Sequence, residues 1–435
     1  MKDEGTGLQV YKFGGASVKD AAAILNLCRI VRDFGPSGPL LIVVSAMGKT
    51  TNALEEIFNL ASSEQDWDDS MQLLRRYHQQ VIDILSQEIP AFDKIAAEAG
   101  LDDQLYSLDA ELRRAVLEPD YEEHYDQTVS LGERISVQIV TAALAGALSK
   151  EEVCHLSAPL VLRTDTSWRE GRVDWRETTG LVQQTVDYAV IAGAKVIVTE
   201  GFIGGTTDGR ITTLGREGSD YSAAIFAYCL RAESVTIWKD VPGLLNADPK
   251  IFPDTVLYPE ISYQETIEMA FYGASVIHPK TLKPLAERGI PLRVKSFLDP
   301  SAPGTLIHDC QHPPLVPAFI RKGGQGLLSF ESKDFTFISE ENLEVIFGAL
   351  AQARLKINVM QNSAISFSVV VDYNEMRVQR LLGVLQGQFR VQYNSGLTLF
   401  TIKHYDAASV ARLTAGRELL LEQRTRNTFQ FLVRE

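Results

Sequence analysis

Cysteine is scarce in this sequence. Four cysteines occur in 435 residues, they lie far apart, and no two of them form a Cys-x-x-Cys pair. This spacing argues against a disulfide framework and gives no sign of a zinc site built on paired cysteines. We interpret the four side chains as reduced thiols, most of them in the core.

Long apolar runs are also missing. The longest uncharged stretch of interest, residues 135–149, is shorter than the ~18 apolar residues of a membrane span and contains Ser136, Gln138 and Thr141. The first four residues do not form a basic region that leads into an apolar stretch, so we expect no secretory signal. These features predict a soluble, cytoplasmic protein without a membrane partner.

Basic residues are fewer than acidic residues in this sequence. The 42 Lys and Arg residues face 56 Asp and Glu residues, which gives a net charge of −14. Residues 51–126 hold 19 acidic and 5 basic side chains, and this segment accounts for the whole excess. A surface that follows nucleic-acid phosphates needs clustered Lys and Arg, so we expect no nucleic-acid partner. A locally basic anion site elsewhere in the chain remains compatible with this composition.

Apolar runs alternate with helical stretches in the first 307 residues. The chain is long enough for two or three domains of roughly 150 residues each. Short apolar runs predict buried strands at residues 8–13, 40–44, 194–199 and 234–238. Strands that alternate with helices predict an α/β domain in three layers, with a mostly parallel sheet between helices. Residues 52–131 contain a single glycine, Gly100, and are predicted to form an acidic helical insert.

The pattern changes after a proline-rich segment. Residues 308–317 contain Pro313, Pro314 and Pro317 and are predicted to be a linker. From residue 318 to residue 435, short strands and helices follow one another in a βαββ order, which predicts an α+β module with helices on one face of an antiparallel sheet. We therefore divide the chain into a domain at 1–307, a linker at 308–317 and a module at 318–435.

Two glycine-containing loops are candidates for anion binding. Residues 12–17, Lys-Phe-Gly-Gly-Ala-Ser, lie at a strand-to-helix junction, where glycines let backbone N–H groups approach an anion and Lys12 can reach a phosphoryl group. Residues 212–224 combine glycines, hydroxyls and Asp220 before a helix of small residues. Each loop also has a simpler explanation: a glycine turn with a solvated lysine, and a helix N-cap at Ser219 or Asp220.

A third segment is similar to the end of a P-loop. Gly48, Lys49 and Thr50 follow a predicted strand, but the P-loop motif requires a glycine at position 43, where this sequence has Val43 inside the strand. We therefore do not expect P-loop chemistry.

Seven motifs together resemble the aspartate kinases of the amino-acid kinase superfamily. In chain order they are KFGGASV, VVSAMGKTTN, SLGERIS, EGFIG followed by TTLGREGSDYSAA, IWKDVPGLLNADPK, GASVIHPKT and PGTLI, and they extend over about 300 residues in the order of the family. Residues 318–435 resemble the tandem ACT domains of the same enzymes. The resemblance implies an amino-acid-kinase-like catalytic domain at 1–307 and an ACT-like regulatory or dimerisation module.

Aspartate kinases transfer the γ-phosphoryl group of ATP, with Mg²⁺, to the β-carboxylate of L-aspartate and form 4-phospho-L-aspartate, the first step of lysine, threonine and methionine biosynthesis. The resemblance therefore implies an ATP-dependent phosphotransferase with a carboxyl acceptor. A carboxylate is already ionised near neutral pH, since Asp titrates near ~3.9, and it needs no general base as a nucleophile. Catalysis then depends on positioning and on charge neutralisation, which suits a site of lysine and backbone N–H groups without a histidine dyad.

Matches to the family's motifs assign the site residues. The implied catalytic residues are Lys12, Gly14, Gly15, Ser17 and Asp220. The residues implied to hold aspartate are Thr51, Glu133, Arg163 and Asp165. The residues implied to contact the nucleotide are Lys12, Gly15, Lys239, Asp240, Leu245, Asp248, Lys250, Gly273, Ala274 and Ser275. In these roles Lys12 would neutralise the transferring phosphoryl group, Glu133 would pair with the α-ammonium, and Arg163 would grip the α-carboxylate. The metal ligands stay unassigned.

Three positions depart from the family's pattern. Glu217 replaces the middle glycine of the usual Gly-Arg-Gly-Gly-Ser-Asp, and Ser275 replaces a lysine of the nucleotide site. Lys239 replaces a threonine and adds a cation. Our hypothesis is that Lys239 takes over the charge lost at position 275.

The resemblance also implies a regulatory partner. ACT domains of relatives bind lysine or threonine and join two subunits, so the resemblance implies a homodimer and an effector site at Asn362 and Ser363. The stretch 360–366 keeps a serine but lacks the glutamate of the family's effector loop, which leaves a purely dimerising role open. Two other functions stay open: another amino-acid kinase, acting on acetylglutamate, glutamate or uridylate, and a catalytically inactive amino-acid sensor.

Overall fold

The computed structural model describes residues 7–118, 120–274, 277–311, 315–334 and 336–434. The chain forms two compact units. The N-terminal unit comprises Met1–Leu244, Leu257–Ile267 and Val276–His312. The C-terminal unit comprises Leu245–Val256, Glu268–Ser275 and Pro313–Glu435. Two short segments from the middle of the chain therefore group with the C-terminal unit, and no single cut after residue 307 separates the two. Part of the expected linker, residues 312–314, lies outside the described residues.

An eight-stranded sheet in the order β3-β4-β2-β1-β7-β9-β10-β8 forms the centre of the N-terminal unit. Its strands are β1 (Gln9–Phe13), β2 (Leu40–Val44), β3 (Val153–Leu156), β4 (Val196–Glu200), β7 (Ser234–Lys239), β8 (Glu260–Ser262), β9 (Leu292–Ser296) and β10 (Thr305–His308). Neighbouring strands run parallel except β9 and β10. Every residue of β2 and β4 is buried, as the continuous apolar runs predict for strands covered on both faces.

Helices cover both faces of this sheet. The described helices of this unit outside the insert are α1 (Ala21–Phe34), α6 (Leu131–Ala147), α7 (Ala158–Val161), α8 (Trp175–Ile191), α9 (Gly218–Leu230) and α11 (Pro279–Arg288). Helix α10 (Tyr263–Tyr272) begins in this unit, and its residues from Glu268 onward group with the C-terminal unit. Apolar residues of α1 and α6 share a core with Tyr11 and Phe13 of β1. Helix α9 approaches β1, β2 and β7 from the face that Lys12 points toward. The expected three-layer α/β fold is confirmed.

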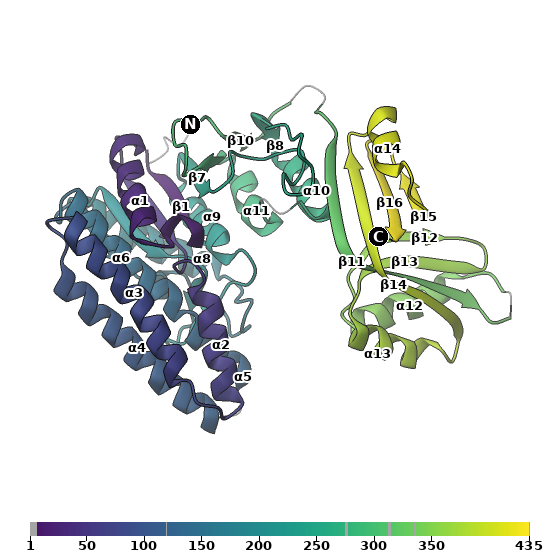
Figure 1. Cartoon of the computed structure of the whole chain (residues 1–435), viewed down its shortest axis with the longest axis horizontal. Coiled ribbons are helices and arrows are strands. Elements are labelled where there is room, and N and C mark those ends of the chain that lie inside the picture. Colours follow the sequence, from purple (N-terminus) through teal and green to yellow (C-terminus); the bar gives the residue numbers. More distant parts are fainter. Residues whose placement is uncertain (1–6, 119, 275–276, 312–314, 335, 435) are drawn as a thin grey trace. The chain divides into compact units, whose positions relative to one another are not determined.

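Four helices occupy the acidic stretch: α2 (Thr50–Ser62), α3 (Asp68–Glu88), α4 (Lys94–Leu117) and α5 (Tyr121–Val129). Helices α3 and α4 lie side by side (Figure 1). One buried carboxylate, Asp126, ties α5 to the small sheet of β5 (Ile203–Gly205) and β6 (Ile211–Thr213): it accepts hydrogen bonds from the backbone N–H groups of Thr213 and Arg169, both at 2.9 Å. Asp126 therefore fixes the helical insert to the segments that contain Arg169 and Thr213.

The C-terminal unit contains a six-stranded antiparallel sheet in the order β12-β13-β11-β14-β16-β15. Its strands are β11 (Ala318–Ser332), β12 (Ile357–Asn362), β13 (Ser366–Asp372), β14 (Phe389–Lys403), β15 (Leu419–Arg424) and β16 (Thr428–Arg434). Its helices from residue 313 onward are α12 (Glu340–Gln352), α13 (Glu375–Leu385) and α14 (Ala407–Thr414). The expected α+β class is confirmed. The longest strands, β11 and β14, continue through polar and glycine residues, including Gly323, Gly324 and Gly396, where an apolar pattern does not mark a strand.

In the described part of the chain, every helix is too short or too polar to cross a membrane.

Candidate active site

A cleft of about 510 Å³ opens where β1, β2 and β7 end. The carboxyl ends of neighbouring parallel strands are a common place for ligands in α/β proteins. Its lining residues are Lys12, Gly15, Ser45, Ala46, Gly48, Thr51, Glu55, Tyr125, Glu133, Arg169, Phe202, Thr213, Gly215, Arg216, Glu217, Gly218, Ser219, Asp220 and Lys239. The cleft thus brings together Lys12, Gly15, Thr51, Glu133, Asp220 and Lys239 from the residues expected to form the site.

Two lysines share one carboxylate in this cleft. Lys12 Nζ, at the end of β1, lies 2.6 Å from Asp220 Oδ1, and Lys239 Nζ, at the end of β7, lies 3.3 Å from Asp220 Oδ2. The Asp220 side chain is only 4% exposed. Burial opposes ionisation of Asp220, but the charges of Lys12 and Lys239 outweigh burial and hold its pKa below the ordinary value. One buried carboxylate therefore holds two ammonium groups at the cleft wall.

The first glycine loop needs Gly15 for close packing. A Cβ on Gly15 would lie 2.9 Å from the carbonyl oxygen of Ala46, so only glycine lets this loop lie against the one that follows β2. A short 3-10 helix, Gly15–Val18, precedes α1 here. Ser17 is buried, and its hydroxyl donates to the carbonyl oxygen of Trp238 at 3.3 Å. Gly14 and Ser17 are outside the cleft lining, and the Ser17 hydroxyl instead joins the first glycine loop to β7 through Trp238.

The second glycine loop carries an unusual backbone at Glu217. This residue has φ 55° and ψ 29°, in the left-handed region that favours glycine, and it directly precedes α9. Glycine suits position 217 because it adopts this left-handed backbone without strain. Any other residue, including the glutamate present here, adopts it at a cost of about 1 kcal/mol. Within the described residues, Oε2 of Glu217 is buried without a hydrogen-bond partner. A carboxylate oxygen at the cleft wall is thus left for a ligand.

Glu133 presents a second carboxylate oxygen of this kind. It lies in the first turn of α6, is 3% exposed, and its Oε1 accepts a hydrogen bond from the backbone N–H of Ala46 at 3.2 Å. Its Oε2 finds no hydrogen-bond partner among the residues described. Burial raises the pKa of Glu133 to about 8, against the opposing effects of the Ala46 hydrogen bond and the Lys12 charge. A ligand cation placed against Oε2 would restore the charged form.

The structure does not bring Arg163 and Asp165 into the cleft. The Arg163 guanidinium donates to the carbonyl oxygens of Pro159 and Thr206, both at 3.3 Å, and pairs with Glu177. Asp165 instead organises a turn, where it accepts hydrogen bonds from the backbone N–H groups of Ser167 at 3.1 Å and Arg172 at 3.0 Å. Both side chains stabilise the loop after α7 and are occupied by protein partners.

Two other arginines, Arg169 and Arg216, line the cleft, although the family's motifs did not assign either of them to the site. Arg169 lies with its guanidinium carbon 3.7 Å from the ring centre of Tyr125 and pairs with Glu122. Arg216 is exposed and makes no ion pair with any described residue. It belongs to the TTLGREGSD motif, so its position in a glycine loop next to Asp220 was an available signal.

The remaining expected residues lie outside this cleft. Asp240 is exposed directly after β7. Leu245, Asp248, Lys250, Gly273 and Ala274 belong to the C-terminal unit, and Ser275 lies outside the described residues. Asn362 ends β12, and Ser363 forms an exposed turn with Ser366, with 2.9 Å between their hydroxyl oxygens. The nucleotide and effector assignments stay predictions.

Sequence and structure comparisons place these features in a family. Over 302 residues the chain is 32% identical to a bifunctional aspartokinase/homoserine dehydrogenase of Haemophilus influenzae, covering 69% of this chain and 36% of that protein. Over 215 residues it is 37% identical to lysine-sensitive aspartokinase 3 of Escherichia coli, covering 48% of each. The chain thus spans between about a third and a half of the length of these curated relatives.

A solved structure matches nearly the whole chain. The crystal structure of E. coli aspartokinase III in complex with aspartate and ADP superposes with a TM-score of 0.82 and 27% identity, covering 98% of this chain and 96% of that one. The family model described as "Amino acid kinase family" matches residues 7–296, which contain every residue that lines the cleft. The chain therefore belongs to the amino acid kinase family.

Proposed function

We propose that this protein is an aspartate kinase, which transfers the γ-phosphoryl group of ATP to the β-carboxylate of L-aspartate. The observation that carries the proposal is the charge arrangement of one cleft. Two ammonium groups lie on Asp220, and the buried Glu133 leaves Oε2 without a partner among the described residues. An amino dicarboxylate and a phosphoryl donor together supply the opposite charges. The likeness to aspartokinase III, solved with aspartate and ADP, supports the same assignment.

Each proposed role follows from a contact in the cleft. Lys12 and Lys239 neutralise charge on the transferring phosphoryl group, and Asp220 holds both lysines in position. Glu133 pairs with the α-ammonium of aspartate. Arg216, without an ion pair in the described part of the protein, takes the α-carboxylate role that the motif match gave to Arg163. The β-carboxylate attacks without a general base, because it is ionised at neutral pH.

Mg²⁺ is the cation that the family implies. It prefers oxygen ligands, and it is usually held by one or two carboxylates together with substrate phosphates. Glu217 fits this role, since its buried Oε2 lacks a partner within the described residues and lies at the cleft wall. When bound, Mg²⁺ would neutralise phosphate charge.

The acceptor is tested by an aspartyl hydroxamate assay with ATP and Mg²⁺, in which aspartate, glutamate and N-acetylglutamate are compared. We expect product with aspartate and much less with the other two. N-acetylglutamate has no ammonium group for Glu133, and glutamate is one methylene longer, a difference that typically changes selectivity by about 10-fold to 200-fold. A preference for N-acetylglutamate or glutamate identifies a different amino-acid kinase. No turnover, with aspartate bound, identifies an inactive sensor.

Lys239→Thr tests whether this lysine replaces the cation missing at position 275. We expect the ATP KM to rise or kcat to fall by about tenfold or more, because a hydrogen bond to a charged group contributes about 1.5–3 kcal/mol. Lys49→Thr is the matched control: Lys49 is exposed and outside the cleft lining, so both constants should stay unchanged. Unchanged kinetics for Lys239→Thr would remove Lys239 from the nucleotide site.

Aspartate binding should depend on pH through Glu133. With a pKa of about 8 in the free protein, Glu133 is mostly protonated at pH 7 and must lose its proton to pair with an ammonium. Affinity should therefore fall about tenfold per pH unit below pH 8, and binding at pH 7 should release about one proton. Calorimetry in buffers of different ionisation enthalpy measures this release.

Glu133→Gln is the control for this pH dependence. The variant should bind aspartate more weakly and without proton release. A wild-type affinity that is flat from pH 6.5 to pH 8.5 contradicts the role given to Glu133.

The C-terminal unit is proposed to be an ACT-like module that joins two subunits and binds an effector near Asn362 and Ser363. Lysine is the first candidate, because aspartokinase III was also solved with lysine and aspartate and matches this chain with a TM-score of 0.77 at 28% identity. We expect lysine, and not threonine, to lower the initial rate and raise the melting temperature. Asn362→Ala should abolish both effects. No response to either amino acid leaves the module with dimerisation alone, which light scattering measures.

A further inference from the structure

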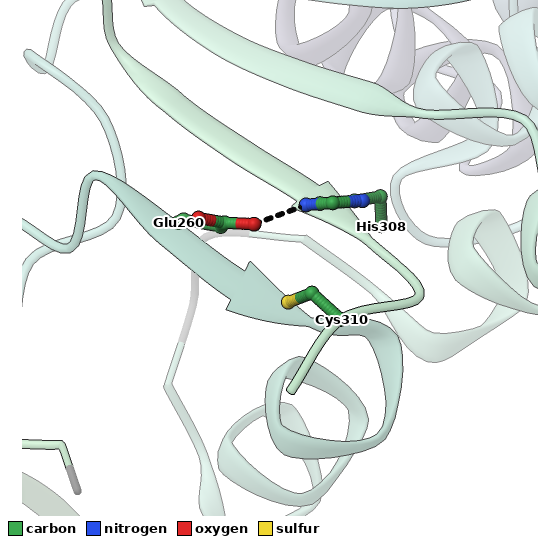
Figure 2. A group of neighbouring side chains, drawn as sticks. All are labelled: Glu260, His308 and Cys310. Atoms are coloured by element: carbon green, nitrogen blue, oxygen red, sulfur yellow. Dashed lines mark hydrogen bonds and ion pairs between the residues drawn. The ribbon is translucent and has the colours of Figure 1, made fainter. Parts of the chain in front are cut away.

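Three side chains of different chemistry converge at one edge of the large sheet, outside the cleft. Glu260 lies in β8, the edge strand, and His308 ends the neighbouring β10. The two strands are parallel, with Glu260 paired to Leu306 and Ser262 paired to His308, so Glu260 and His308 lie on the same face. Cys310 follows two residues later and its sulfur points toward the other two side chains (Figure 2).

The spacing of the three groups suits a metal ion. His308 Nε2 lies 2.5 Å from Glu260 Oε1, and the ligand atoms of all three residues lie within 4.8 Å of one another. In a tetrahedral zinc site, bonds of about 2.0–2.3 Å place neighbouring ligand atoms roughly 3.3–3.7 Å apart. To reach these distances, the ligand atoms of Glu260, His308 and Cys310 need to move by about 1 Å, which side-chain rotation alone can supply. The backbone register of β8 and β10 already brings the ligands together.

The ligand set and its exposure favour zinc over magnesium or calcium. A thiolate and an imidazole bind Zn²⁺ well, whereas Mg²⁺ and Ca²⁺ prefer oxygen ligands alone. Glu260 is exposed and the other two side chains are half-buried, so an ion can enter from solvent. Three protein ligands leave a fourth position for water.

A second group of glutamate, histidine and cysteine shows that the spacing between histidine and cysteine decides whether the sulfur can join the other two side chains. His155 Nε2 lies 2.9 Å from Glu200 Oε1, and Cys154 precedes this histidine directly. Because successive side chains of a strand point to opposite faces, Cys154 of β3 points away from the His155–Glu200 pair. The same three residue types therefore form only an ion pair there. At His308 and Cys310, the spacing of two residues puts the sulfur on the same side.

We propose that Glu260, His308 and Cys310 bind one Zn²⁺ ion and that this ion fastens the segment after β10 to the sheet edge. On binding, the Cys310 thiol gives its proton to solvent and the thiolate coordinates the metal. The site lies wholly within the N-terminal unit and shares no residue with the cleft, so it does not depend on the proposed kinase activity.

Co²⁺, a spectroscopic substitute for Zn²⁺, provides the test. It is titrated into the reduced, chelator-treated full chain without nucleotide. We expect one equivalent to produce a thiolate-to-cobalt charge-transfer band, which Zn²⁺ abolishes by displacement. Cys310→Ser should lose the band. His308→Ala and Glu260→Gln should keep it but weaken binding at least about tenfold, since even partners of metal ligands contribute 10-fold to 100-fold.

Cys154→Ser and His155→Gln are the matched controls and should behave as the wild type. Thermal unfolding of the metal-free variants checks that each one is folded, and Zn²⁺ should raise the melting temperature of the wild type but not of Cys310→Ser. A band that survives in Cys310→Ser, or that Cys154→Ser removes, places the metal elsewhere. No band in the wild type leaves Glu260 and His308 as an ion pair and overturns the proposal.

Discussion

A carboxylate buried between two ammonium groups is the constraint on which the site depends. Asp220 can remain ionised at 4% side-chain exposure only because Lys12 and Lys239 lie against it. The lysines lie at the carboxyl ends of two neighbouring parallel strands, β1 and β7, and α9 places the aspartate against them from one face of the sheet. The sheet order, the glycine loop before α9 and the positive wall of the cleft therefore form one arrangement. Moving any of the three elements would leave a buried charge without its partner.

Glu133, another carboxylate that lines the cleft, differs from Asp220 in its surroundings. Among the described residues, no lysine or arginine lies at hydrogen-bond distance from its carboxylate, and burial raises its pKa to about 8. If an ammonium group binds there, as proposed, the free energy of binding includes the recovery of this charge. In the proposed reaction, the two lysines would face the phosphoryl group and the ionisable Glu133 would face the amino acid.

Sequence patterns identified the features that depend on local chemistry. Buried parallel strands appear as apolar runs, and glycines that allow close backbone contact, such as Gly15, appear as loop motifs. Side-chain direction was harder to predict. Arg163 follows a short helix and turns toward backbone carbonyls, while Arg216 of the second glycine loop lines the cleft. The Glu260–His308 pair was out of reach, because 48 residues separate its members and only the pairing of β8 with β10 brings them together.

The central claim is that Asp220 acts by positioning the two lysines. A double-mutant cycle on kcat with Lys12→Met and Asp220→Asn tests it most directly. If Asp220 acts through the lysines, each single change should lower kcat by about 10²-fold or more, and the Asp220→Asn loss should be at least about tenfold smaller in the Lys12→Met background. Equal losses from Asp220→Asn in both backgrounds would show that the carboxylate and the ammonium act independently, and would contradict this account of the site.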